Sequence, residues 1–528
     1  MILKFVLTAA VDRSISHPPD VMTPSSHKKL SLLSLVALVV GSMVGSGIFA
    51  LPSAFGRATG SLGAIIAWVV AGSGMLMLAF VFQTLAVRKP ELDSGVYIYA
   101  KAGFGDYFGF AAAFGYWMGC CFADAACLIL IKATLGLFFP IFGDGTTPTA
   151  LASATALLWG VHFLVLRGVK EAAFINTVAT VAKIVPIVIF IVIAAVSFRS
   201  DVFAANFWGG EHPGGPPTPR TDAEKLPLYH IDPDGEGAKP DEPRESESVY
   251  RQVRNTMLLT VFVFVGIEGA SVYSRYARRR SDVGRATVLG FLGVLSLLVL
   301  VTMLSFGILS RAELAALPTP SLAAVLEAIV GRWGAVFISV GLLISVLGNY
   351  LSWSLLAAEV TFSAAKNGTM PAFLARENAK QVPSAALWAT NIMIQLILLI
   401  SPFAEYAFLL VLKMTSAMTL VPYLLVAAYG LKLEWTGESY DETPRGRTGN
   451  LVSGAIATIY AAGMIYAGGA RFFLLSALIY APGTVLYFLA RREQKAPVFK
   501  PAEWFVFGGV VIAAFVGLYG LISGWISI

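Results

Sequence analysis

The stretch Val39-Val40-Gly41-Ser42-Met43-Val44-Gly45-Ser46-Gly47-Ile48-Phe49 decides the fold of this chain. It lies in an apolar segment from about Leu30 to Leu51, which is long enough to cross a bilayer as a helix. Glycine weakens a helix by roughly 1 kcal/mol relative to alanine. Unwound backbone in a membrane is tolerated only where protein or a watery cavity satisfies it. We therefore expect a helix broken in mid-membrane with its free amides directed at a ligand. The alternative is close helix packing through Gly41 and Gly45.

A second apolar segment carries a similar interruption. The stretch Phe262-Val263-Phe264-Val265-Gly266-Ile267-Glu268-Gly269-Ala270-Ser271 places two glycines around a carboxylate. Two glycine-interrupted spans at corresponding positions in the two halves of a chain indicate the binding site of a secondary transporter. The pair of stretches therefore favours broken helices over simple packing.

Composition places the chain in a membrane. Of its 528 residues, 57% are hydrophobic and only 13% are charged, which is far too apolar for a soluble globular protein. The net charge of +6 does not require a nucleic acid partner, because membrane proteins collect Lys and Arg in their cytoplasmic loops. Cys120, Cys121 and Cys127 fall in one apolar segment, so they form neither a disulfide framework nor a metal motif.

Apolar segments of spanning length predict an all-α polytopic membrane protein with about 13 transmembrane helices. The turn between the eleventh and twelfth spans is very short, at Gly468-Gly469-Ala470-Arg471. The predicted spans are 31–51, 62–87, 106–139, 149–166, 174–197, 253–277, 284–309, 334–365, 384–401, 404–430, 450–470, 471–490 and 503–526.

Basic residues fix the predicted orientation. If the spans alternate, the loops that carry Lys and Arg all lie on one side, which is the cytoplasmic side. Residues 1–30 then form a cytoplasmic N-terminal tail, and residues 199–252 form an extracytoplasmic loop. The acidic run 241–247 in that loop either concentrates cations at the entrance or belongs to a solvated insertion. We expect a multi-pass protein of the bacterial cytoplasmic (inner) membrane.

The motifs Gly45-Ser46-Gly47-Ile48-Phe49, Gly95-Val96-Tyr97 and Gly266-Ile267-Glu268 resemble the amino acid–polyamine–organocation superfamily. Within it the chain looks most like the basic amino acid antiporters of arginine/ornithine and lysine type. The resemblance implies a five-plus-five inverted repeat with broken first and sixth helices. The repeats would be residues 31–198 and 253–430, and residues 431–528 would hold spans eleven to thirteen.

The two breaks are the predicted substrate site. A substrate carboxylate needs donors and a positive dipole end, which the half-helix starting near Ser46 offers. The resemblance assigns the carboxylate to Ser46 and Gly47, the α-ammonium to carbonyls freed by unwinding, and a closing aromatic gate to Phe262. The break residues expected at the site are Ser42, Met43, Gly45, Ser46, Gly47, Phe262, Val265 and Gly266.

Side-chain selectivity requires further groups. The resemblance places the third-span residues Tyr116, Gly119, Cys120 and Asp124 at substrate-contacting positions. An unpaired carboxylate in hydrocarbon is costly, so Asp124 should face a cavity or a cation. It either contacts the cationic end of the substrate or pairs with Lys132, about two turns further along the helix.

Two later spans supply further candidates. In the eighth span, Trp353 falls where the antiporters stack an indole on the substrate cation, an interaction of roughly 2 kcal/mol when desolvated. The alternative for such a tryptophan is an anchor at the membrane interface. In the tenth span, Thr415 lies in the stretch where the family has a substrate-contacting serine.

Three charged residues at membrane depth are predicted to act in coupling or gating. Lys183 occupies a position where sodium-coupled relatives bind sodium, and its ammonium can tie the fifth span to the first. The alternative is a lysine that snorkels to the membrane surface. Glu268 beside the second break either couples the site to a gate or is a structural hydrogen-bond acceptor. Lys413 would need neutralisation by Glu268, Asp124 or another acid.

The expected function is secondary active transport of cationic amino acids, with arginine/ornithine exchange by alternating access. The alternative is a proton-coupled lysine or polyamine permease. The sequence contains no HExxH, GxSxG or Walker motif and no histidine cluster, so we predict no enzyme, no cofactor and no metal site. The expected partners are cationic amino acids and membrane lipid, with no nucleic acid; a homodimer is left open.

Overall fold

The computed structural model describes residues 31–92, 95–168, 172–209, 248–268, 280–403, 406–438, 440 and 446–526. Nearly all of these residues are helical, and none of them forms a strand. The predicted tail 1–30 lies outside the described residues. So do residues 210–247 of the predicted outer loop and Gly269-Ala270-Ser271 of the second break.

The first half of the chain contains the first break and four long helices. The helix α2 (Leu32–Met43) is followed by the 3₁₀ turn η1 (Ser46–Ala50) and by α3 (Leu51–Ala58). The remaining helices are α4 (Ser61–Arg88), α5 (Val96–Phe104), α6 (Asp106–Gly136), α7 (Pro148–Leu166), α8 (Ala172–Val196) and the short α9 (Ser200–Ala205).

The second half begins with a helix that stops in mid-span. The helix α10 (Val249–Phe262) ends at Phe262, and the chain continues in turns as far as Glu268. The helices that follow are α12 (Arg280–Phe306), α13 (Arg311–Ala316), α14 (Ser321–Val330), α15 (Arg332–Lys366), α16 (Ser384–Ile400), α17 (Ala407–Thr436), α18 (Arg447–Glu493) and α19 (Pro501–Ile522).

Nine helices in the described part of the chain are long and apolar enough to cross a membrane, or ten if the bent pair at the first break counts as one span. The 47 residues of α18 cover both the predicted eleventh and twelfth spans, and Gly469 interrupts them with φ 75° and ψ 174°. That glycine lies in the predicted short turn. The polytopic helical architecture is confirmed, while the count of thirteen and the inverted repeat stay predictions.

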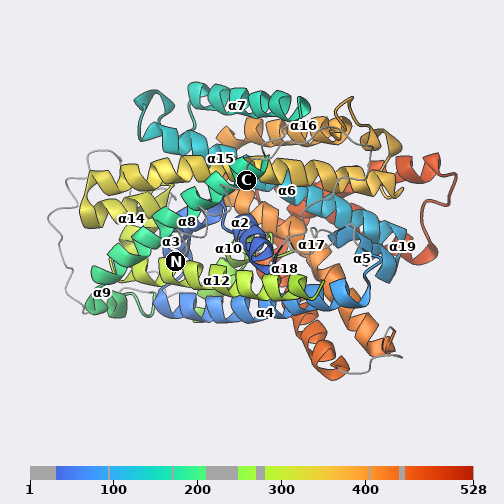
Figure 1. Ribbon diagram of the computed structural model, residues 1–528, viewed down its shortest axis with the longest axis horizontal. Helices are drawn as coiled ribbons and strands as arrows, with labels where there is room; N and C mark the ends of the chain where they lie inside the picture. The colour runs from blue at the N-terminus through green and yellow to red at the C-terminus, as the bar shows by residue number, and fades with distance from the viewer. Residues whose placement is uncertain are drawn as a thin grey trace, which may run out of the picture.

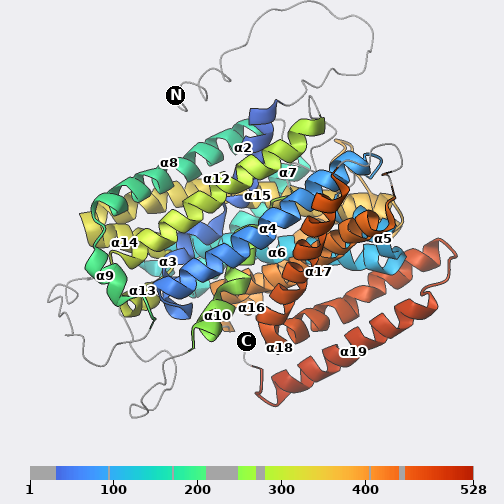
Figure 2. The same ribbon diagram turned by 90° about the horizontal axis from the view of Figure 1, so that it is seen from below.

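The helices α6 and α15 run through the middle of the bundle (Figure 1). The central position of α6 shows in its burial: 83% of its apolar window is inside the protein, against 17% for α19. The helices α7 and α16 lie side by side at one edge (Figure 1), and α19 packs on α18 at another (Figure 2). The two central helices therefore lie between helices that are more exposed on their outer faces.

The described residues contain the first break and the beginning of the second. The helix pair that spans the first break is bent by 41° between Met43 and Ser46. At the second break, Gly266 has a φ of +107°, which side chains other than glycine rarely adopt. A Cβ on Gly266 would also lie 2.9 Å from the Ser42 carbonyl carbon, and the Ser42 hydroxyl donates to the Gly266 carbonyl at 2.9 Å. The two unwound segments therefore lie against each other.

Candidate functional site

A small cavity lies where the two breaks meet. Its volume is about 20 Å³, which is room for a single water molecule. An amino acid does not fit in this volume, so a larger ligand can enter only after the surrounding groups move. The cavity is lined by Ser42, Met43, Gly45, Ser46, Gly47, Ile48, Ala123, Phe262, Val263, Val265, Leu298, Asn349 and Trp353.

The glycines of the first break permit close contacts with two other spans. A Cβ on Gly47 would lie 2.7 Å from Cε1 of Phe262, so the aromatic ring rests directly on this glycine. A Cβ on Gly45 would lie 2.9 Å from Nδ2 of Asn349 on α15. Ser46 between them is 1% exposed. The Ser46 hydroxyl makes no hydrogen bond within the usual distance to any described residue, although the Cys127 thiol faces it.

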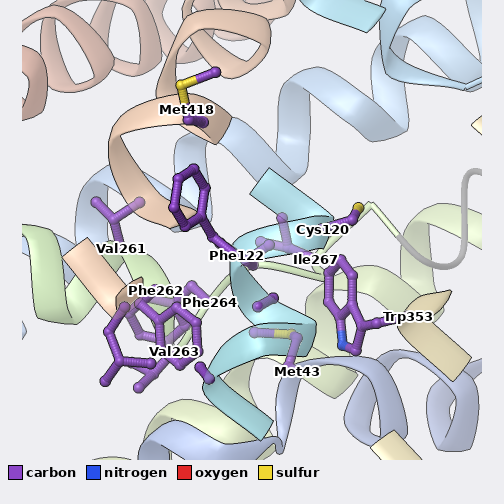
Figure 3. Close-up of a cluster of buried hydrophobic side chains, with 14 of the residues drawn as sticks. Met43, Cys120, Phe122, Val261, Phe262, Val263, Phe264, Ile267, Trp353 and Met418 are labelled. Carbon is purple, nitrogen blue, oxygen red and sulfur yellow. The ribbon is translucent and has the colours of Figure 1, made fainter. Parts of the chain in front are cut away.

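Residues from five spans line the cavity, and apolar side chains from four of these spans gather beside it. Figure 3 shows Met43 of the first break, Phe262 and Val263 of the sixth span, Cys120 of α6 and Trp353 of α15 gathered in one cluster. Trp353 is 5% exposed and lies well inside α15, so it is not an anchor at the end of its helix. Its indole is placed to contact whatever fills the cavity.

Glu268 is held by two tyrosines from other helices. Tyr116 on α6 donates its hydroxyl hydrogen to Oε1, and Tyr423 on α17 donates to Oε2 at 2.6 Å. The Gly266 amide also donates to Oε2, at 3.3 Å. Tyr116, predicted to contact substrate, thus contacts Glu268 in this conformation. The carboxylate connects the second break to α6 and α17, and Tyr423 was not identified from the sequence.

Lys183 connects three spans. Its ammonium group donates to the Gly41 carbonyl at 2.6 Å and to Oδ1 of Asn349 at 3.3 Å. The side chain is 1% exposed, so it does not snorkel to the membrane surface. The expected link between the fifth and first spans is therefore present, and it includes α15 through Asn349.

Asp124 lies beside the cavity and does not line it. Its neighbour Ala123 is the cavity residue. Asp124 is 0% exposed, and neither of its oxygens has a hydrogen-bond partner among the described residues. Lys132 donates instead to the Ser401 hydroxyl at 3.3 Å. The alternative of an Asp124–Lys132 pair is therefore not found in this structure.

The remaining predicted residues lie further from the cavity. Gly119 packs on α17, where a Cβ would meet the Thr419 hydroxyl at 2.5 Å. The Thr415 hydroxyl donates to the Val411 carbonyl of its own helix. The Lys413 ammonium lies 5.7 Å from the centre of the Phe472 ring, and among the described residues it forms no salt bridge, so the expected neutralising acid is not found.

Sequence reasoning missed several residues of the site. Asn349 carries the clearest signal, because a buried amide four residues before Trp353 lies on the same face of α15. The apolar lining residues carry no signal that separates them from ordinary span residues. They are Ile48, Ala123, Val263 and Leu298. Among the described residues, no group of His, Cys, Asp and Glu side chains could hold a metal ion.

Comparison with known proteins gives the family. Residues 30–489 match the amino acid permease family. The chain belongs to this family. The match agrees with the resemblance to the amino acid–polyamine–organocation superfamily and covers every cavity residue named above.

Three relatives show how far the similarity extends. The arginine/ornithine antiporter of Pseudomonas aeruginosa is 50% identical over 514 residues, covering 96% of this chain and 100% of the relative. The L-lysine transport protein of Corynebacterium glutamicum is 38% identical, covering 96% and 97%. The arginine/agmatine antiporter of Chlamydia abortus is 35% identical, covering 89% and 91%.

Proposed function

We propose that this protein exchanges cationic amino acids across a membrane, with arginine entering as ornithine leaves, by alternating access. The observation that carries the proposal is the cavity where the two breaks meet beside Trp353, in a chain that is 50% identical to an arginine/ornithine antiporter over 96% of its length. Substrate sites of secondary transporters lie between broken helices, and this cavity lies between the two breaks.

The first break is the proposed subsite for the α-carboxylate and α-ammonium groups. Ser46 Oγ has donor capacity to spare, and Gly45 and Gly47 line the cavity. Carbonyls of the unwound segments at Met43 and Val265 are the proposed acceptors for the ammonium. These groups recognise any α-amino acid and do not select for a cationic side chain.

Selectivity is proposed to come from the opposite side of the cavity. Trp353 offers a π face, which attracts a guanidinium or ammonium by roughly 0.5–2 kcal/mol. Asp124 has no cation bonded to it among the described residues, so a small rotation of α6 would make its carboxylate the counter-ion of the substrate. Phe262 resting on Gly47 is the proposed gate that separates the site from one side.

Coupling is proposed to involve the two buried charges that bridge spans. Glu268, with its tyrosine donors, connects the second break to α6 and α17. Lys183 connects the first break to α8 and α15. Each break is thus tied by charge-assisted hydrogen bonds to helices that do not unwind, and movement of either break must exchange these bonds for others. This proposal includes no direct contact between the substrate and Lys413, Gly119, Cys120 or Thr415.

The proposed setting is the bacterial cytoplasmic membrane, with the N-terminus in the cytoplasm and an inverted repeat of residues 31–198 and 253–430. Thirteen spans would then place the C-terminus outside. Cysteine labelling from either side of the membrane, at Ser25 and at Ser523, tests this orientation. The outcome predicted is reaction of a Ser25→Cys variant from the cytoplasm and of a Ser523→Cys variant from outside.

Counterflow in liposomes tests the exchange. Labelled arginine should enter liposomes preloaded with ornithine, arginine or lysine and should be excluded from empty ones. The second candidate, a proton-coupled lysine or polyamine permease, is favoured by the similarity to an L-lysine transport protein. Equal uptake into empty liposomes under a pH gradient would support this candidate and refute exchange, and competition by putrescine would extend it to polyamines.

A further inference from the structure

Asn349 has hydrogen-bonding capacity that its contact with Lys183 does not fully use. It lies in the middle of α15, is 4% exposed and lines the cavity between the two breaks. Its side-chain amide has one carbonyl oxygen and two N–H donors. A buried polar group of this kind is stable only when its partners are satisfied, so the direction of each atom identifies what it can bind.

The orientation of the amide follows from the chemistry of its partners. Lys183 can only donate hydrogen bonds, so the atom that faces its ammonium at 3.3 Å must be the carbonyl Oδ1. The amino group Nδ2 therefore points the other way, where it donates to the Cys127 sulfur at 3.6 Å. A thiol sulfur is a weak acceptor. The donor capacity of Nδ2 is thus poorly used in this conformation.

Nδ2 is directed at the first break. It lies 2.9 Å from the position that a Cβ on Gly45 would take. The next residue, Ser46, has a buried hydroxyl without a hydrogen bond to the described residues. Two underused donors from different spans, Ser46 Oγ and Asn349 Nδ2, therefore converge on the same side of the cavity. No carboxylate is among the residues that line the cavity.

Lys183 strengthens this donor through the amide. A cation bound at Oδ1 draws electron density from the amide and makes its N–H groups better donors, as in any polarised chain of hydrogen bonds. Lys183 itself does not line the cavity, and its shortest hydrogen bond is donated to the Gly41 carbonyl. Its charge can reach a ligand in the cavity only through an intermediate group, and Asn349 is the residue that contacts both.

We propose that Asn349 is a further ligand of the substrate carboxylate and that its amide transmits the positive charge of Lys183 to that carboxylate. The proposal rests on the amino acid exchange proposed above and adds a residue of the eighth span to a carboxylate subsite otherwise built from the first. It also gives Lys183 a role in substrate recognition besides its tie to the first span.

The test compares two ligands that differ only in the carboxylate. L-argininamide keeps the α-ammonium and guanidinium groups of L-arginine and replaces the negative carboxylate by a neutral amide. Affinities of both are measured by competition against labelled ornithine on the purified full-length protein. In Asn349→Asp, a carboxylate replaces the donor while still accepting from Lys183, so arginine affinity should fall at least tenfold and argininamide affinity less than threefold.

A matched control separates recognition from packing. Asn391 on α16 is another fully buried amide, bonded to Tyr350 and His162 and absent from the cavity lining. Asn391→Asp should change both affinities by the same factor. A second variant, Asn349→Ala, removes the donor without adding charge and should show the same preference in a weaker form.

The outcomes distinguish this inference from the function on which it rests. Equal losses for the two ligands in both Asn349 variants would overturn the proposal and reduce Asn349 to a packing residue. Failure of the unmodified protein to bind arginine or ornithine would refute the proposed exchange instead. A selective loss for arginine, with argininamide retained, supports both.

Discussion

A methyl group added at Gly47 tests whether the Phe262 ring closes the substrate cavity. The new Cβ would lie 2.7 and 2.8 Å from Cε1 and Cδ1 of Phe262 and 2.9 Å from Cγ1 of Val263, all below the shortest ordinary carbon contacts. Overpacking of this kind costs about 1–3 kcal/mol. The proposed gate closes over bound arginine by resting the same ring on the break, so the arginine-bound state bears the cost. Arginine affinity in Gly47→Ala should therefore fall roughly 5- to 150-fold.

A double-mutant cycle identifies the source of that loss. Phe262→Leu removes the ring atoms that meet the methyl group, so the Gly47→Ala, Phe262→Leu double variant should bind arginine better than the product of the two single effects predicts. Gly160→Ala is the matched control, because a Cβ there meets no atom within 4 Å. Binding is measured by calorimetry on purified protein. Additive effects, or wild-type affinity in Gly47→Ala, would refute the packing of Phe262 on the first break.

Three further changes test other parts of the molecule. Trp353→Leu keeps apolar bulk and removes the π face, so arginine affinity should fall by roughly tenfold or more in competition assays, and unchanged affinity would assign Trp353 to packing. Asp124→Asn should express normally, because Lys132 bonds elsewhere, and should lose preference for cationic over neutral amino acids; poor expression rescued by Lys132→Met would contradict this. The hydrogen bond from Lys89 to Glu438, outside the spans, raises the Lys89 pKa. Glu438→Gln should therefore lower the melting temperature below pH 10.5, where Lys89 is charged in both folded and unfolded chains, and the difference from wild type should vanish as the pH rises through the raised value.

The sequence by itself determined the helical membrane architecture and the place of both breaks. Backbone polar groups in hydrocarbon must be paired within the protein, so long apolar segments can only be helices. Each of the nine long apolar helices in the described residues overlaps a predicted span or, for α18, two of them. Glycine clusters in two such segments marked where the helices stop, at Met43 and at Phe262. Gly469 likewise interrupts α18 within the short turn that the sequence predicted between the eleventh and twelfth spans. These features are local, because each depends on residues close together in the chain.

Tertiary structure alone decided how the buried charged groups are partnered. Hydropathy shows that Glu268, Asp124 and Lys183 lie at membrane depth, but their partners come from helices up to about 170 residues away. Helix packing gave Glu268 two tyrosine donors and gave Lys183 a carbonyl and an amide, while it left Asp124 without a partner in the described residues. A hydrogen bond depends on distances of a few tenths of an ångström. Those distances are set by how whole helices pack against one another, and spacing along a single helix does not contain them.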